Sequence, residues 1–199
     1  MRKLIRFFIF AAFSVIAMAA SARDGADKHW QVELGVGPTF GYSKVMGLSN
    51  NQAGATIFGE ARYAFSKVPV SVGLQVATNL YSRDYYSGGD EITGASGIDF
   101  FSTNIMITGD YYLEINDKIN LFAGAGLGYC KINNSKNVEI SDADFGAISV
   151  GDDGPSGTAA FMPRVGVLFF NKIRLTVGYR FEEKANRSAF ATAGFVFRF

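Results

Sequence analysis

The amino-acid sequence predicts an all-β fold, an eight-stranded antiparallel up-and-down barrel that crosses a membrane. Three observations lead to this prediction. Short segments alternate between apolar and polar residues, which is the period of a strand with two different faces. After the N-terminal region, no stretch reaches the roughly 18 consecutive apolar residues of a membrane-spanning helix. The connections alternate between short and long, which is typical of barrels with tight turns at one end.

The first part of the chain is predicted to be a signal peptide, covering residues 1–22. Basic residues dominate 1–6, an apolar run covers 7–19, and Ala-Ser-Ala at 20–22 is a small-x-small cleavage site. The alternative is an uncleaved anchor helix, but the apolar run is shorter than the roughly 20 residues that such a helix needs. We therefore expect residues 23–199 to form the barrel domain.

The composition limits the chemistry that the chain can perform. The formal net charge of +1 gives no electrostatic reason to expect nucleic acid as a partner. Cys130 is the only cysteine and His29 the only histidine, so neither an intrachain disulfide nor a histidine-cluster metal site is expected. The sequence indicates no cofactor.

The first four expected strands each have an apolar side and a polar or small side. Segment 30–42 alternates Trp, Val, Leu, Val, Pro and Phe with Gln, Glu, Gly and Thr. Segment 55–65 places Ile, Gly, Ala, Tyr and Phe opposite Thr, Phe, Glu, Arg and Ala. Segment 69–81 places Val and Leu opposite Ser, Gly, Gln, Ala and Asn. Segment 101–113 places Ile, Tyr and Leu opposite Asn, Met, Thr, Asp and Tyr.

The last four expected strands follow the same pattern. Segment 119–129 places Leu, Ala and Tyr opposite Asn, Phe and Gly. Segment 159–169 places Phe and Val opposite Met, Arg and Gly. Segment 173–181 places Leu, Val, Tyr and Phe opposite Arg and Thr. Segment 191–199 places Ala and Phe opposite Thr, Gly, Val and Arg. Segments of this length suit tilted strands, which need about 9–11 residues to cross hydrocarbon.

The lengths of the connections predict which end of the barrel is the periplasmic end and which is the outer end. Those after the second, fourth and sixth strands are short, at 66–68, 114–118 and 170–172. The others are expected to be long surface loops, at 43–54, 82–100, 130–158 and 182–190. Short turns belong to the periplasmic end of bacterial barrels and long loops to the outer end.

The polar side of the strands carries charges that we expect to face the lumen. They are the carboxylates of Glu33, Glu60 and Asp110 and the guanidinium groups of Arg62, Arg164, Arg174, Arg180 and Arg198. A shift of one residue would turn most of these charges toward lipid, where an Arg costs about 2–4 kcal/mol at the midplane. A network of ion pairs plugging the lumen is the favoured interpretation, because eight strands leave an interior that side chains fill. A gated path for small ions is the alternative.

The sequence resembles the small outer-membrane β-barrel proteins of Gram-negative bacteria, the OmpA/OmpX type. The resemblance rests on Leu-Phe-Ala-Gly-Ala-Gly-Leu-Gly-Tyr at 121–129, Val-Gly-Tyr-Arg-Phe at 177–181 and Phe-Val-Phe-Arg-Phe at 195–199. It implies a bacterial outer-membrane location and an assembly signal, read by the barrel-assembly machinery, at Phe195, Phe197 and Phe199. Two-domain members carry a peptidoglycan-binding domain after the barrel. The sequence ends with the eighth expected strand, so a cell-wall role is not expected.

The third expected loop is acidic but lacks the residue spacing of a calcium loop. A solvated loop is one interpretation. The other is a hairpin in which Val-Glu-Ile at 138–140 and Ile-Ser-Val at 148–150 extend the flanking strands and offer an edge to a partner strand.

A structural or surface-interaction role through the long extracellular loops is the function that we expect. The partners would be outer-membrane lipid and an extracellular protein or surface ligand, and the protein would be a monomer. A narrow porin-like channel for ions or small solutes is the alternative. An outer-membrane lipid-modifying enzyme is a lesser one, because His29 precedes the first strand and has no identifiable Ser or Asp partner.

Overall fold

The computed structural model describes residues 29–45, 48–87, 90–91, 98–134, 138–142, 146–150, 157–183 and 186–199. The predicted signal peptide lies outside these residues. In the part of the chain that is described, no helix is long and apolar enough to cross a membrane.

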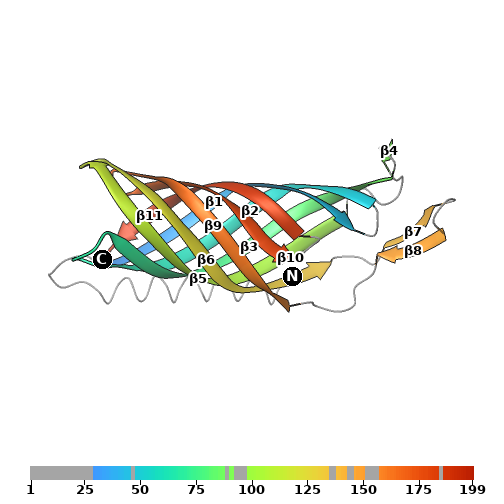
Figure 1. The fold of residues 1–199 in the computed structure, drawn as a ribbon, viewed down its shortest axis with the longest axis horizontal. Coiled ribbons are helices and arrows are strands. Elements are labelled where there is room, and N and C mark those ends of the chain that lie inside the picture. The colour runs from blue at the N-terminus through green and yellow to red at the C-terminus, as the bar shows by residue number, and fades with distance from the viewer. Residues whose placement is uncertain are drawn as a thin grey trace.

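Eight long antiparallel strands close into a barrel, as the sequence predicts (Figure 1). They are β1 (Trp30–Val45), β2 (Leu48–Ala64), β3 (Val70–Ser87), β5 (Ile98–Asn116), β6 (Ile119–Asn134), β9 (Gly157–Phe169), β10 (Ile173–Glu183) and β11 (Asn186–Arg198). Each strand pairs with its neighbours in sequence, and β1 pairs with β11 to close the cylinder. Each barrel strand therefore has a paired neighbour on both sides, which is the arrangement that a strand protein needs in lipid.

Three short strands lie at the end of the barrel opposite the C-terminus (Figure 1). β4 (Asp90–Glu91) pairs with the last residues of β3. β7 (Val138–Asp142) and β8 (Gly146–Val150) pair with each other as a separate two-stranded sheet. The expected hairpin therefore exists, but as a sheet of its own rather than as a paired extension of β6 and β9. We call this end the loop end, and the opposite end the turn end.

Two of the four expected long loops are mostly strand. β1 and β2 stay paired up to Val45 and Leu48, so only residues 46 and 47 separate them. β10 and β11 are separated only by residues 184 and 185. The prediction of long loops at 43–54 and 182–190 is wrong. Backbone N–H and C=O groups can pair in a β-ladder whatever side chains the residues carry. Gly, Ser and Asn, which are common in turns, continue the ladder here.

The two faces of the wall agree with the expected alternation. Apolar side chains such as Leu74, Ile107 and Val177 are about half exposed and point outward. Polar side chains on the alternate positions are buried in the lumen. Exposed aromatic residues gather near both ends, with Trp30 and Tyr111 at the turn end and Phe40 and Tyr129 at the loop end. This is the girdle pattern of membrane barrels.

Inward glycines make room for large side chains on neighbouring strands. A side chain at Gly35 would meet the ring of Phe58 at 2.5 Å, and one at Gly166 would meet the ring of Phe122 at 2.6 Å. A side chain at Gly126 would likewise meet the sulfur of Met106 at 3.3 Å. The lumen is thus packed by alternating small and large residues rather than left open.

The last strand offers a test of the assembly signal expected at Phe195, Phe197 and Phe199. The Phe199 N–H donates one hydrogen bond to Trp30 O at 2.9 Å. Deleting Phe199 should therefore change the free energy of unfolding of inserted protein by only about 1 kcal/mol. We expect a much larger fall in the amount of protein found in the membrane, measured by immunoblotting. Phe199→Tyr, which keeps the aromatic ring, is the control. Normal membrane levels after the deletion would contradict the assembly role.

Candidate functional site in the barrel lumen

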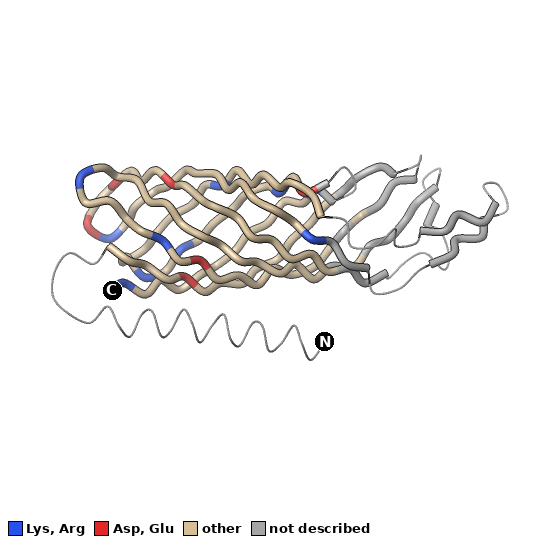
Figure 2. The backbone as a smooth tube through the Cα atoms, turned by 90° about the horizontal axis from the view of Figure 1, so that it is seen from below, with Lys and Arg blue, Asp and Glu red and all other residues tan. Residues whose placement is uncertain are grey.

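A compact group of six charged side chains fills the lumen on the turn-end side of its centre. They come from β1, β2, β5, β9 and β10, and each is no more than 2 % exposed in its side chain. Charged positions within the length of the barrel are visible in Figure 2. We call this group the charge network, and its members are Glu33, Glu60, Arg62, Asp110, Arg164 and Arg174.

Arg164 is the centre of the charge network. Its two terminal nitrogens donate to the two oxygens of Glu60, both at 2.7 Å. Its Nε and Nη2 donate to the two oxygens of Asp110 at 2.9 and 2.8 Å. A guanidinium group can do this because it is planar and presents five N–H donors in a fixed fork. Arg164 therefore joins strands β2, β5 and β9 across the lumen.

The other two arginines, Arg62 and Arg174, form ion pairs with the carboxylates of the charge network. Arg62 donates to Glu33 from Nη2 and forms an ion pair with Glu60 at 3.0 Å. Arg174 donates to Asp110 at 2.8 Å, and its guanidinium carbon lies 3.6 Å from the centre of the Phe122 ring. Stacking on the ring face adds a cation–π attraction to the ion pair.

Neutral groups add further hydrogen bonds to the charge network. Gln75 and Thr108 donate to Glu60 at 3.0 and 2.7 Å. The hydroxyl of Tyr112 accepts from both Arg62 and Arg174 at 3.1 Å. Three carboxylates therefore face three guanidinium groups, and the formal charge of the network is zero. Buried charges are tolerated only when they are paired and hydrogen-bonded in this way.

A second polar cluster lies nearer the loop end. Arg180 donates to Thr56 at 2.9 Å, and Thr56 donates to Asn79 at 2.7 Å. Asn79 and Asn104 donate to the carboxylate of Glu182 at 3.3 and 2.6 Å. The guanidinium group of Arg180 and the carboxylate of Glu182 are thus linked through the neutral side chains of Thr56 and Asn79. Arg180 also lies over the ring of Phe190, 4.1 Å from its centre.

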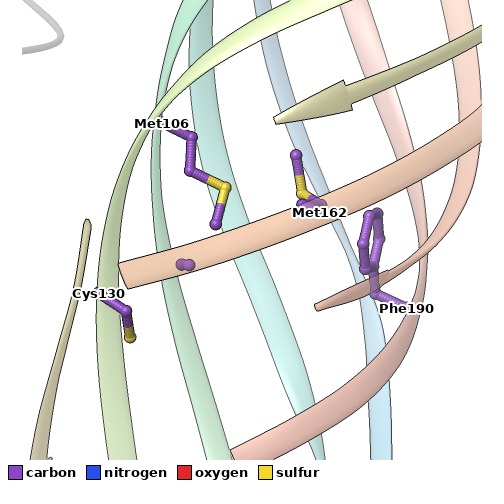
Figure 3. Close-up of a cluster of buried hydrophobic side chains, with 5 residues drawn as sticks. Met106, Cys130, Met162 and Phe190 are labelled. Atoms are coloured by element: carbon purple, nitrogen blue, oxygen red, sulfur yellow. The ribbon is translucent and has the colours of Figure 1, made fainter. Parts of the chain in front are cut away.

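An apolar cluster fills the lumen beside this second cluster. Its members are Met106, Cys130, Ala160, Met162 and Phe190, and four of them are labelled in Figure 3. They come from β5, β6, β9 and β11. These apolar side chains offer few hydrogen-bond partners to a water molecule in this part of the lumen.

The space that remains between the charge network and the second cluster is very small. It is a cavity of about 10 Å³, bounded by Glu33, Gln75 and Arg164 on one side and by Arg180 and Phe190 on another. A cavity of this size holds about one water molecule. Side chains therefore nearly fill this part of the lumen.

The turn end is open in contrast. A hollow of about 370 Å³ is lined there by His29, Arg198, Asn171 and other side chains. Arg198 donates to Asn171 at 2.9 Å, and it takes part in none of the ion pairs found among the described residues. The His29 Nδ1 lies 3.1 Å from Ala64 O, and its ring centre lies 5.5 Å from that of Tyr63.

The structure divides the eight inward charges that the sequence places in one network. Six of them meet, but Arg180 belongs to the second cluster and Arg198 lies at the turn-end hollow. Arg180 is three inward positions beyond Arg174 along β10, and Arg198 is the last residue of β11. These two residues therefore lie apart from the other six, because distance along the strand axis separates them.

Glu182 is a buried charged residue of the lumen that the sequence did not indicate. It was expected in a surface loop, but it is 3 % exposed and faces the lumen from β10. Continuing the alternation of that strand by one more inward position, from Arg180 to Glu182, would have found it. Among the described residues, no group of three or more His, Cys, Asp or Glu side chains is arranged to hold a metal ion.

A closed antiparallel barrel with a lipid-facing apolar belt and a polar, filled lumen defines a class, the integral barrels of bacterial outer membranes. The family model of the outer membrane protein beta-barrel domain matches residues 8–181, so the chain belongs to this family. The protein is located in the bacterial outer membrane. No curated protein matches the chain in sequence.

Several solved structures are similar to this chain. Neisserial surface protein A is 16% identical over 88% of this chain and 100% of its own, with a TM-score of 0.55. The attachment invasion locus protein Ail of Yersinia pestis, in complex with the heparin analogue sucrose octasulfate, is 17% identical over 85% and 99%, with a TM-score of 0.43. OprG from Pseudomonas aeruginosa is 10% identical over 87% and 98%, with a TM-score of 0.47. At these identities the likeness concerns the fold alone.

The charge network predicts a large cost for losing its central cation. Arg164→Met leaves the three buried carboxylates of the charge network with only two guanidinium groups, and Glu60 and Asp110 each lose a partner. We expect the free energy of unfolding, measured by urea titration in lipid or detergent, to fall by about 3–5 kcal/mol. Lys172→Met, at an exposed turn position, is the control and should stay within about 0.5 kcal/mol of wild type.

A rescue variant identifies the reason for this loss. Adding Asp110→Asn to Arg164→Met leaves two carboxylates, Glu33 and Glu60, against the two guanidinium groups of Arg62 and Arg174, and should recover part of the stability. If Arg164→Met cost no more than Lys172→Met, the network would not be holding the barrel together.

Proposed function

We propose that the protein is a surface-interaction scaffold, in which a plugged barrel anchors strands that project from the outer membrane. The closed lumen is the observation that carries this proposal. The cavity that the charge network and the second cluster border measures about 10 Å³. A barrel filled in this way has little capacity for transport, so its role is expected at the surface that it displays.

The lengths of the strands support a display role. β1, β2, β3, β5 and β6 contain 16 to 19 residues, against the roughly 9–11 that cross hydrocarbon. These strands therefore extend past the membrane on the side of the long connections, which faces the cell exterior in barrels of this kind. The β7–β8 hairpin lies on the same side (Figure 1).

The β7–β8 hairpin is the segment that we propose as the contact surface. It forms a two-stranded sheet with no other strand attached to it among the described residues. Such an edge offers backbone N–H and C=O groups to an extended partner segment. Residues 135–156 carry five acidic side chains against the single Lys136, so a basic partner segment is favoured.

A non-enzymatic role is part of the proposal. His29 is the only histidine of the chain, and it lies at the turn end, away from the projecting strands. A general base must reach the proton that it removes. All eight barrel strands find partners within one chain, which supports a monomer, with outer-membrane lipid around it.

Deleting residues 135–155 should abolish adherence of bacteria displaying the protein to cultured epithelial cells, while the barrel stays folded. Folding is checked by the heat-dependent shift of gel mobility. Ile140→Pro is the sharper variant, because it removes a backbone donor from β7 but keeps every acidic residue. It should weaken adherence if the strand edge is what binds. Adherence retained by the deletion would rule out the hairpin as the contact surface.

The plugged lumen predicts that the purified protein shows no reproducible unit conductance in planar bilayers. Phe58→Ala, next to the small cavity, should remain silent as well, because the charge network stays intact. Unit conductance in wild type that changes with Arg164→Ala or Glu60→Ala would support the porin-like channel instead and would overturn the plugged scaffold.

A further inference from the structure

The ladder between β9 and β10 is incomplete at the loop end. β10 pairs with β9 up to Gly178 and Arg164, misses two positions, and makes one last pair between Phe181 and Phe161. Both strands continue beyond it, β9 back to Gly157 and β10 on to Glu183. On its other side, β9 stays paired with β6 as far as Gly157. The wall is therefore unpaired between β9 and β10 over its last residues.

A proline lies at the start of this gap. Pro163 has no N–H and so removes a ladder hydrogen bond. Pro38 makes a similar two-residue gap between β1 and β11, but there the ladder resumes for three pairs, from Thr39 to Gly41. A proline alone therefore does not end the pairing, and the divergence of β9 and β10 is a separate feature of this seam.

A cavity of about 340 Å³ lies at the divergence. Its floor is a row of register partners that crosses four strands, namely Leu127, Phe161, Phe181 and Arg187. All four side chains are exposed on the outer, lipid-facing side of the wall. We call this cavity the notch. Its volume is at the lower end of the range for ligand pockets.

Residues of both faces of the wall line the notch. Ala159 belongs to the outer face, whereas Ala160 and Glu182 belong to the lumen. In a continuous sheet, the paired backbone separates these two faces. Ala160 is also a member of the apolar cluster, so the notch adjoins the apolar part of the lumen. The carboxylate of Glu182 is held by amide donors from β3 and β5.

The chemistry of the notch selects its occupant. Three of its four floor residues are apolar, and it lies at the height of the loop-end aromatic girdle. Arg187, the fourth, adds a positive charge, and its guanidinium carbon lies 6.0 Å from the centre of the Phe181 ring. Long cationic side chains near a membrane boundary reach toward anionic headgroups.

We propose that the notch binds an acyl chain of an anionic lipid of the outer leaflet. Arg187 pairs with the phosphate of the headgroup, and the chain passes between β9 and β10 to touch the apolar cluster. Met106 and Met162 suit this contact because unbranched methionine side chains adapt to a variable apolar guest. The barrel would then have a lipid site that opens sideways, independent of any surface partner.

Photo-crosslinking tests the proposal. The protein is placed in phosphatidylcholine vesicles containing a phosphatidylglycerol whose acyl chain ends in a diazirine. After irradiation, labelled residues are mapped by mass spectrometry. Lipid-facing residues will be labelled whether or not the notch is occupied. Labels on Ala160, Met162 or Cys130 are diagnostic, because these side chains face the lumen and are at most 3 % exposed.

Two substitutions close the notch in different ways. Ala159→Trp fills it, and Pro163→Val restores a backbone donor at the gap. Each is expected to reduce labelling of the lumen-facing residues at least fivefold, while Pro38→Val leaves it unchanged. Heat-dependent gel mobility shows that each variant is folded. Absence of lumen-facing labels in wild type, or labels that persist in both closing variants, would overturn the proposal.

The headgroup is tested with the same vesicles. A diazirine phosphatidylcholine should label the lumen-facing residues several-fold less than the phosphatidylglycerol, and Arg187→Gln should remove this difference. Equal labelling by both lipids in wild type would overturn the assignment of an anionic headgroup.

Discussion

The need to neutralise charge inside a lipid-surrounded cylinder shapes the whole molecule. A carboxylate or guanidinium group that faces the lumen is cut off from bulk water and must find its counter-charge within the barrel. Arg164 does this most fully, since it holds Glu60 and Asp110 at the same time. Because the partners come from different strands, the requirement sets the register of those strands as firmly as the lipid-facing apolar belt does.

Size complementarity makes that neutralisation possible. Glycines on one strand receive the large groups of the next, as with Gly35 beneath Phe58 and Gly166 beneath Phe122. The lumen is consequently a succession of layers, from the hollow at the turn end through the charge network to the second cluster and the apolar cluster. The two middle layers, the charge network and the second cluster, are buried.

Most of the wall could be predicted from the sequence, whereas the contacts across the lumen could not. Strict alternation identified all eight strands and the inward side of each, because the pattern of residues such as Val70, Val72 and Leu74 has a period of two. It did not identify the extension of β2 back to Leu48, since Asn and Gly there resemble a turn. The separation of Arg180 and Arg198 from the charge network depends on how far apart the inward positions lie along the barrel axis. The divergence at Pro163 depends on the neighbouring strand, as the contrast with Pro38 shows.

The make-up of the charge network also has a consequence for how the barrel closes. The strands from β1 to β6 supply Glu33, Glu60 and Asp110 but only one of the three cations, Arg62. A sheet of these strands alone therefore carries two uncompensated negative charges, and Arg164 and Arg174 on β9 and β10 cancel them. Neither part of the wall is neutral without the other, so both keep their water until they meet, and expulsion of that water coincides with closure.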